Sequence, residues 1–267
     1  MKSIELSKRI RIHALKMHYI SKTSHIGSNF SVADILSVLY TYILNFDLHN
    51  EKWENRDRLI YSKGHAATIL YSILGEIGFI DKKLLNDYGK NNQPLAGHIT
   101  HKIKGIEFST GSLGHGGSIS NGIALALKRK KLSSRVFVIL SDGEMNEGST
   151  WESILFAGHH KLANIVYILD NNKFQAFGRT ENILNMGNIC AKLKEFGWSA
   201  AEVNGHNHKE LKNIFEKLPL EKVKPSFILA HTIKGKGVDF MEDNLLWHYK
   251  SPNKEEYELA LKKLKEN

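Results

Sequence analysis

The most chemically informative residues follow two short apolar runs in the middle of the chain. Asp142 comes just after the run at 136–140, and Asn172 ends the Asp-Asn-Asn triplet that follows the run at 165–169. Both runs are rich in β-branched residues and bounded by polar ones, a pattern typical of strands buried in a parallel sheet. Residues 151–161 between them are long enough for a crossover helix, so the segment predicts a βαβ unit.

Such a unit places oxygen ligands where parallel sheets bind their ligands, at the carboxyl ends of the strands. The Asp142 carboxylate, the Asn172 amide oxygen and a nearby carbonyl, which the spacing assigns to Phe174, form a set suited to Mg²⁺ or Ca²⁺ rather than zinc. Gly143 has no side chain to keep a phosphate from nearby backbone N–H groups. An Asp-Gly pair alone is usually an ordinary solvated turn, but the thirty-residue interval from Asp142 to Asn172 favours a ligand site.

The stretch 141–172 resembles the thiamine-diphosphate motif, which begins Gly-Asp-Gly and ends Asn-Asn about thirty residues later, although Ser141 replaces the first Gly. The segments "EMNEGSTWES" and "AGHHKLANI" are similar to transketolases in particular. The resemblance covers roughly residues 3–252. It implies an α/β thiamine-diphosphate-binding fold, with a mostly parallel central sheet and helices on both faces. It also implies thiamine diphosphate and Mg²⁺ as cofactors, with Ca²⁺ or Mn²⁺ as possible substitutes.

The same resemblance assigns roles to histidines in four loops. His65 in "SKGHA" and His248 in "LLWHYK" would contact the cofactor diphosphate, and His248 would also face the substrate. His25 and His98 would contact the sugar. A single loop histidine is more often a surface residue, but here all four match family positions. Histidines suit proton transfer at sugar hydroxyls because their pKa lies near neutrality.

A glycine-rich loop at 105–117 resembles the family segment that lies against the cofactor rings. Taken alone, such a loop is weak support for any function. On the resemblance, the catalytic residues would be His25, His98 and His248. The metal ligands would be Asp142, Asn172 and the carbonyl of Phe174. The cofactor-binding residues would be His65, Gly111, Leu113, Asp142, Gly143, Glu147, Asn172 and His248.

Transketolases also need a glutamate that activates the aminopyrimidine ring, supplied by a pyrimidine-binding domain of the opposing subunit. No residue of this chain matches that glutamate. The resemblance therefore implies the N-terminal subunit of a split transketolase, active only with a C-terminal partner subunit in an α2β2 assembly. It would transfer a two-carbon ketol unit from a ketose phosphate to an aldose phosphate, as in the pentose phosphate pathway.

Three alternatives remain open at this stage. The chain could be half of another thiamine-diphosphate enzyme, either a 1-deoxyxylulose-phosphate synthase or a dehydrogenase E1, which share the metal motif. It could belong to a transketolase of a specialised sugar pathway. It could also be a binding module without activity, since fold does not imply function. The segments "SKGHA", "GSLGHG" and "HHKLANI" favour transketolase, and the retained Asp142 and Asn172 argue against an inactive module.

Composition limits the class of protein. The 267 residues are 42% hydrophobic and 24% charged, enough to bury a core, and we expect one domain over 1–267. The single cysteine, Cys190, excludes an internal disulfide and suits a cytoplasmic protein, and we expect it to be buried. No apolar run predicts a membrane span or a secretory signal. The net charge of +9 comes from scattered lysines and arginines without a nucleic-acid-binding motif, a field that would attract sugar phosphates.

Outside the central unit, periodicity predicts an amphipathic helix over 3–20 and a second helix over 32–42 with Ser31 as its N-cap. A strand is expected at 59–62, followed by a helix that begins near His65. Residues 198–215 are expected to form a strand, a loop and a helix. Residues 225–238 are expected to contain a last strand. The tail at 253–264 reads as an exposed helix.

Overall fold

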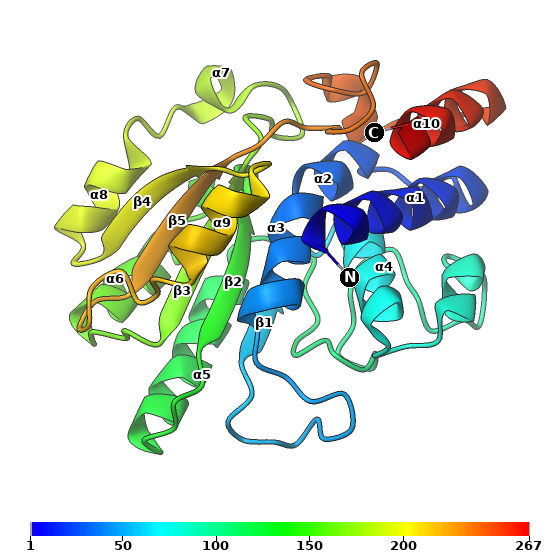
Figure 1. The fold of residues 1–267 in the computed structure, drawn as a ribbon. Helices are drawn as coiled ribbons and strands as arrows, with labels where there is room; N and C mark the ends of the chain where they lie inside the picture. Colours follow the sequence, from blue (N-terminus) through cyan, green and yellow to red (C-terminus); the bar gives the residue numbers. More distant parts are fainter. Residues whose placement is uncertain (1, 267) are drawn as a thin grey trace.

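A five-stranded parallel sheet forms the centre of the protein (Figure 1), for which the computed structural model describes residues 2–266. Its spatial order is β1-β2-β3-β5-β4, and every neighbouring pair is parallel. The strands are β1 Arg58–Tyr61, β2 Val136–Ser141, β3 Ile165–Asn171, β4 Ser199–Asn204 and β5 Ser226–His231. The two apolar runs are β2 and β3, and helix α6 (Gly148–His159) connects them, so the predicted βαβ unit is confirmed.

The register of the sheet brings the strand ends level. Ser141 of β2 pairs with Asp170 of β3, and Asn171 of β3 pairs with His231 of β5. The residues that follow these strands therefore emerge side by side at one edge. The sequence order of the strands also changes after β3, where β5 lies between β3 and β4, and parallel sheets bind ligands near such a change of order.

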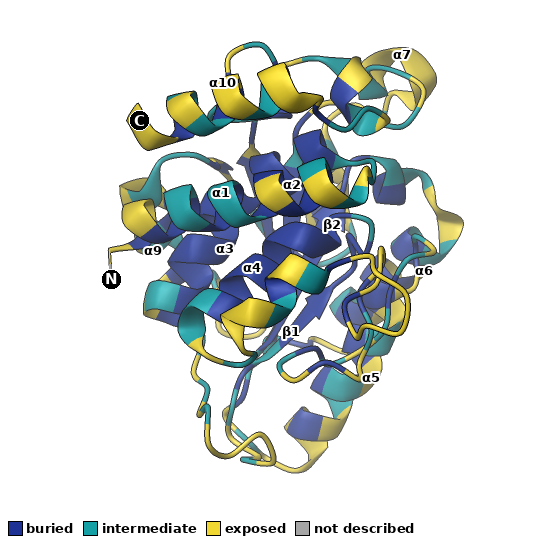
Figure 2. Cartoon of the chain, turned by 90° about the vertical axis from the view of Figure 1, so that its right-hand side faces the viewer, coloured by how far each residue is buried: buried dark blue, intermediate teal, exposed yellow. Residues whose placement is uncertain are grey.

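Helices cover both faces of the sheet, as predicted. Residues of β2 alternate between two buried apolar clusters, because successive side chains of a strand point to opposite faces. Phe137 and Ile139 pack on one side with α1–α4 and α9, while Val136 and Val138 pack on the other with α5, α6 and α8. Figure 2 shows α3 and α4 almost entirely buried. The helices are α1 Ser3–Ser21, α2 Ile26–Ser31, α3 Ala33–Val38, α4 Ala67–Ile77, α5 Gly116–Arg129, α8 Ile189–Glu195 and α9 His208–Phe215.

The segment after α1 differs from the predicted single helix at 32–42. Helix α2 begins earlier, and α3 continues into a π-helical turn, Leu39–Ile43. The prediction of Ser31 as an N-cap is wrong, because Ser31 ends α2 and donates its hydroxyl proton to Asp170 Oδ2 at 2.6 Å. Tertiary contact with the edge of the sheet replaces the local capping bond.

The C-terminal helix α10 (Lys254–Glu266) lies beside α1 (Figure 1). The sequence predicts an exposed helix here, yet Ala260 and Leu264 are buried in the larger apolar cluster. Tyr257 stacks on Tyr19 of α1 with ring centroids 4.3 Å apart. The remaining short elements are η2 Lys82–Asp87, η3 Gly143–Asn146, α7 Thr180–Leu184 and η4 Leu245–His248.

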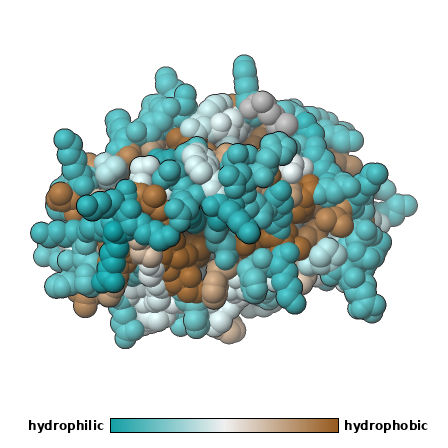
Figure 3. All heavy atoms as spheres, turned by 90° about the horizontal axis from the view of Figure 1, so that it is seen from below, coloured by the Kyte–Doolittle hydropathy of each residue, from teal (hydrophilic) through white to brown (hydrophobic). Residues whose placement is uncertain are grey.

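Figure 3 shows the molecule from below the view of Figure 1. This surface is mainly hydrophilic, with apolar side chains visible in its hollows. No helix within residues 2–266 is long and apolar enough to cross a bilayer. Cys190 is buried, as expected, and burial raises the pKa of its thiol to about 11. Both apolar clusters pack on the same sheet, in keeping with the prediction of one domain, which stays a prediction.

Candidate functional site

A cavity of about 250 Å³ lies where the ends of β1, β2 and β3 converge with the loop before α2. Most of the predicted site residues line it, although they come from segments far apart in the sequence. The lining includes His25, His65, His98, Gly111, Leu113, Gly143, Asn172, Phe174 and His248. The sheet edge therefore gathers into one place the residues that the sequence indicated separately.

Three of the histidines form a cluster. The ring centroid of His25 is 5.3 Å from that of His65 and 4.8 Å from that of His248. The backbone N–H of His25 donates to the His248 carbonyl at 2.8 Å, which ties the loop before α2 to η4. His98 lies over Gly111, where a Cβ would come within 3.0 Å of the His98 ring. The absence of a side chain at Gly111 therefore lets His98 approach the cavity.

The imidazoles of the cluster formed by His25, His65 and His248 are held neutral near pH 7. Burial lowers the pKa of His25 to about 4 and that of His248 to about 3, and it holds the pKa of His65 well below its usual value. Neighbouring basic side chains add to the effect. Lys234 Nζ lies 3.1 Å from His248 Nδ1. Because an ammonium can only donate, Nδ1 accepts and the proton of His248 is on Nε2.

Two fully buried lysines lie beneath the cavity, and no pattern in the sequence indicated them. Lys63 forms an ion pair with Asp170 and donates to the Ser28 carbonyl at 3.1 Å. Lys234 donates to Ser28 Oγ at 3.3 Å and to His248, and within residues 2–266 it forms no ion pair. Burial and the charge of Lys63 lower the pKa of Lys234 to about 8. The site therefore holds a buried cation that forms no ion pair among the described residues, although the charges of Asp142 and Asp170 act on it from a greater distance.

Asp170 is the fixed anion of this network. Besides Lys63, it accepts hydrogen bonds from the hydroxyls of Ser31 and Thr232. Burial would raise the pKa of Asp170, but the Lys63 charge and these hydrogen bonds outweigh it, and the pKa lies below its usual value. Asp170 is thus structural, and it sets the charge around the other carboxylate at this edge, Asp142.

Asp142 lies next to the cavity and is 3% exposed. Its Oδ2 accepts the backbone N–H groups of Asn172 and Lys173 at 2.9 and 3.1 Å. Burial and the charge of Asp170 raise the pKa of Asp142 to about 7. Asn172 lies at the same edge, and its Oδ1 accepts from the Phe174 N–H at 3.2 Å.

This donor set fits a hard divalent cation. Asp142 is a buried carboxylate with a raised pKa that accepts only backbone N–H groups, so it gains from a metal that stabilises its charged form. Within the described residues no three or more His, Cys, Asp or Glu side chains group for metal binding. A metal here would therefore take one carboxylate, one amide, a backbone carbonyl and oxygens from ligand or water, the mixed set that Mg²⁺ accepts.

Glu147 is placed outside the lining of the cavity. It lies against the glycine-rich loop, where a Cβ on Gly114 would come within 2.9 Å of Glu147 Cβ. The buried Glu144, which no sequence pattern indicated, accepts the Gly114 N–H at 3.0 Å and the Ser62 hydroxyl proton. Burial raises the pKa of Glu144. Glu144 therefore holds the loop that carries Gly111 by a hydrogen bond, and Glu147 lies against the same loop.

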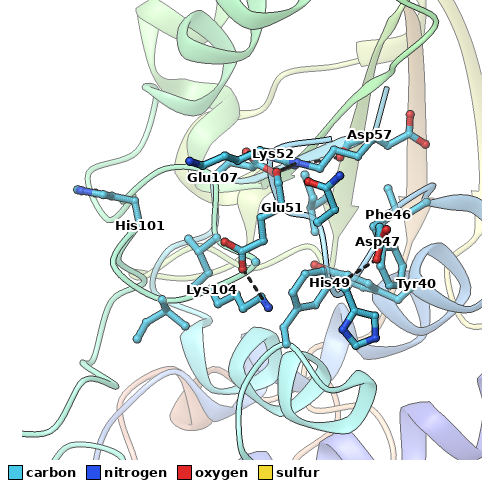
Figure 4. A pocket seen from close by; sticks show the side chains of 18 of the residues that line it. Tyr40, Phe46, Asp47, His49, Glu51, Lys52, Asp57, His101, Lys104 and Glu107 are labelled. Carbon is cyan, nitrogen blue, oxygen red and sulfur yellow. Dashed lines mark hydrogen bonds and ion pairs between the residues drawn. The ribbon is translucent and has the colours of Figure 1, made fainter. Parts of the chain in front are cut away.

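A larger cavity, about 610 Å³, lies near the amino end of β1 (Figure 4). None of the predicted site residues lines it. Half of its eight Asp, Glu, Lys and Arg side chains pair with one another: Arg56 with Glu107, and Lys104 with Glu51 at 3.5 Å. The smaller cavity is therefore the candidate site, because Asn172 of the motif lines it and the buried Lys234 contacts two of its lining residues, Ser28 and His248.

Comparison with known proteins agrees with this geometry. The family model described as "Transketolase, thiamine diphosphate binding domain" matches residues 3–264. The chain belongs to the transketolase family. The family assignment made from the Asp142–Asn172 motif is thus confirmed, and it selects transketolase over the other thiamine-diphosphate enzymes considered.

Relatives in this transketolase family include separately encoded subunits. The chain is 35% identical over 267 residues to one of the subunits of an apulose-4-phosphate transketolase of Phocaeicola vulgatus, covering 100% of this chain and 95% of the relative. It is 35% identical over 256 residues to a 6-deoxy-6-sulfo-D-fructose transketolase subunit of a Clostridium species, covering 95% and 93%. The solved transketolase of Campylobacter jejuni superposes with a TM-score of 0.89 at 28% identity, covering 100% of this chain and 42% of that one. This transketolase chain therefore corresponds to less than half of that solved enzyme and to nearly all of each separately encoded relative.

Proposed function

We propose that this chain is the diphosphate-binding subunit of a two-chain transketolase that moves a two-carbon ketol unit from a ketose phosphate to an aldose phosphate. The observation that carries the proposal is the buried Lys234, which forms no ion pair among the described residues and contacts Ser28 and His248 of the cavity that Asn172 also lines. An anionic diphosphate with its metal would satisfy both sets of groups at once.

The metal would be held by Asp142, Asn172 and the carbonyl of Phe174, with Mg²⁺ as the natural ion and Ca²⁺ or Mn²⁺ as substitutes. The diphosphate would lie against Lys234, His65 and His248 and the backbone at Gly143, while Gly111 and Leu113 would contact the cofactor rings. When bound, thiamine diphosphate supplies the group that cleaves the carbon–carbon bond of the ketose and carries the two-carbon unit.

The chain itself would bind the sugar and manage its protons. His25 and His98 both line the cavity, His98 over Gly111 of the glycine-rich loop and His25 against His65 and His248, and a sugar bound in the cavity would meet their rings. Because burial lowers the pKa of His25 to about 4, its imidazole is neutral near pH 7 and can accept a hydrogen bond from a sugar hydroxyl. The ion pair of Lys63 with Asp170 would keep the floor of the site in place during these transfers.

The remaining half of the site would come from a C-terminal subunit with the pyrimidine-binding domain and its activating glutamate. Two findings support this: relatives of similar length are named as subunits, and the chain covers 42% of the solved Campylobacter transketolase. An α2β2 assembly is the natural closed form. We also propose a cytoplasmic location, since the one cysteine is buried and forms no disulfide.

The sugars of the pentose phosphate pathway are the default substrates. A specialised pathway is the second candidate, because two similar relatives are named for apulose 4-phosphate and 6-deoxy-6-sulfo-D-fructose. A ketol-transfer assay with ribose 5-phosphate as the acceptor separates these possibilities. The three ketose donors to compare are xylulose 5-phosphate, apulose 4-phosphate and 6-deoxy-6-sulfo-D-fructose.

The chain alone should be inactive in that assay and become active when its partner subunit is added. The isolated chain is expected to bind Mg²⁺ and the diphosphate end of the cofactor only weakly, because the ring end of the cofactor would stay in solvent without the partner subunit. Turnover by the purified chain alone would contradict the two-chain proposal. Activity of the assembled enzyme with only one of the specialised donors would assign the substrate to that pathway.

A further inference from the structure

A buried network of charged side chains lies outside the cavity, centred on Asp34 of α3, which is 5% exposed. Arg11 of α1 donates to both its carboxylate oxygens, at 3.0 and 2.6 Å. His206, in the turn after β4, and His208, the first residue of α9, contact the same two oxygens at 2.7 and 3.1 Å. Burial would raise the pKa of Asp34, but Arg11 and the two histidines hold it well below its usual value. Asp34 is therefore a carboxylate that can only accept hydrogen bonds.

The proton of His206 is consequently assigned by its partners. Asp34 Oδ2 accepts, so the proton lies on Nδ1 of His206. The other ring nitrogen, Nε2, accepts the backbone N–H of Ile233 at 2.8 Å. A carboxylate that orients a neutral imidazole through one nitrogen leaves the other as a directed acceptor. Both ring nitrogens are used, and the ring orientation is fixed.

Ile233 immediately precedes Lys234, the unpaired cation of the site. Three hydrogen bonds tie the backbone of residues 233–235 to segments outside this turn after β5. Ile233 N–H donates to His206 Nε2, Gly235 N–H donates to the Gly27 carbonyl at 2.9 Å, and the Lys234 carbonyl accepts the Asp243 N–H at 2.9 Å. The aliphatic part of Lys234 packs on Gly27, where a Cβ would come within 2.9 Å of Lys234 Cγ. The backbone position of residues 233–235 therefore decides where the ammonium of Lys234 lies.

We infer that His206, oriented by Asp34, is a positioning residue that holds Lys234 in the anion-binding site. The inference deepens the proposed function and rests on it, because it concerns how tightly this chain binds a diphosphate. His208 provides an internal comparison. It contacts the same carboxylate and is buried to a similar degree, but its second nitrogen faces Ser3 Oγ at 2.8 Å and not the 233–235 turn.

The test is a calorimetric titration of the full chain with inorganic diphosphate in excess Mg²⁺. His206→Leu removes the hydrogen bonds of this side chain to Asp34 and to the Ile233 N–H. It should weaken diphosphate affinity about tenfold, which corresponds to about 1.4 kcal/mol of binding free energy. His206→Gln should stay within about threefold of wild type, because an amide offers one donor and one acceptor at similar spacing. His208→Leu, the matched control, should lower the melting temperature but leave diphosphate binding within about twofold.

Several outcomes would overturn the inference. Wild-type affinity in His206→Leu, or equal losses in His206→Leu and His208→Leu, would reject positioning by His206 while leaving the proposed function intact. Absence of any binding by the wild-type chain, even of weak binding at high diphosphate concentration, would reject the proposed diphosphate site itself. Nitrogen chemical shifts of His206 give a readout that needs no ligand and no variant: we expect a protonated Nδ1 and a bare Nε2, and the reverse tautomer would also reject the inference.

Discussion

Replacing Lys234 with Met should make the unliganded protein more stable and, at the same time, impair its binding of diphosphate. Lys234 is fully buried, and its hydrogen bonds to the side chains around it go to Ser28 Oγ and His248 Nδ1. Methionine has a similar length and no charge, so it removes the buried ammonium without leaving a large cavity. The substitution therefore measures how much folding stability the protein loses by burying the Lys234 ammonium in its anion-binding site.

The magnitude follows from the pKa. In the folded chain the pKa of Lys234 is lowered from 10.5 to about 8, mainly by burial and then by the charge of Lys63. The unfolded chain binds the proton of Lys234 more tightly than the folded chain, so the buried ammonium lowers the free energy of unfolding. This penalty is about 3 kcal/mol and is fully present below pH 8. It decreases as the pH rises toward 10.5. At pH 7 we expect Lys234→Met to be about 1–3 kcal/mol more stable than wild type, after subtracting the lost hydrogen bonds. By pH 10 the penalty should fall to about 1 kcal/mol or less.

Urea unfolding followed by circular dichroism at pH 7 and pH 10 measures this difference, and calorimetry with Mg²⁺ and inorganic diphosphate measures binding. Binding by Lys234→Met should be about tenfold to a hundredfold weaker, because a hydrogen-bonded charge is lost. Lys63→Met is the control, since it leaves the buried Asp170 without its ion-pair partner and should destabilise the fold by about 3–5 kcal/mol. A Lys234→Met chain less stable than wild type at pH 7, or one that binds diphosphate normally, would refute the reasoning.

The remaining predictions concern residues identified from the sequence. Asp142→Ala should abolish Mg²⁺-dependent cofactor binding in calorimetry on the assembled enzyme, because it removes the one carboxylate of the donor set; unchanged affinity would reject this metal site. His65→Ala and His248→Ala should mainly weaken cofactor affinity, whereas His25→Ala and His98→Ala should lower kcat/KM of ketol transfer by about tenfold or more at unchanged cofactor affinity. Near-normal kcat/KM in both of the latter variants would show that they do not contact the sugar.

The sequence by itself determined the centre of the protein and the family. The apolar runs of β2 and β3 are long enough to be buried on both faces, and their order with the intervening helix favours a parallel βαβ unit. Asp142 and Asn172 follow those strands directly, so knowing the strands was enough to place both at one edge. Such local patterns can be recognised in the sequence because the residues that form each one belong to one or two neighbouring elements.

Other features depend on contacts between segments distant in sequence, and only the tertiary structure decided them. Ser31 looks like a helix cap from its neighbours, but Asp170, 139 residues away, takes its hydroxyl proton instead. Lysine is ordinarily a surface residue, and nothing in the sequence distinguishes Lys234 from the many exposed lysines. Its burial follows from the packing of the turn after β5 against Gly27 and His206, three segments that meet only when the chain is folded.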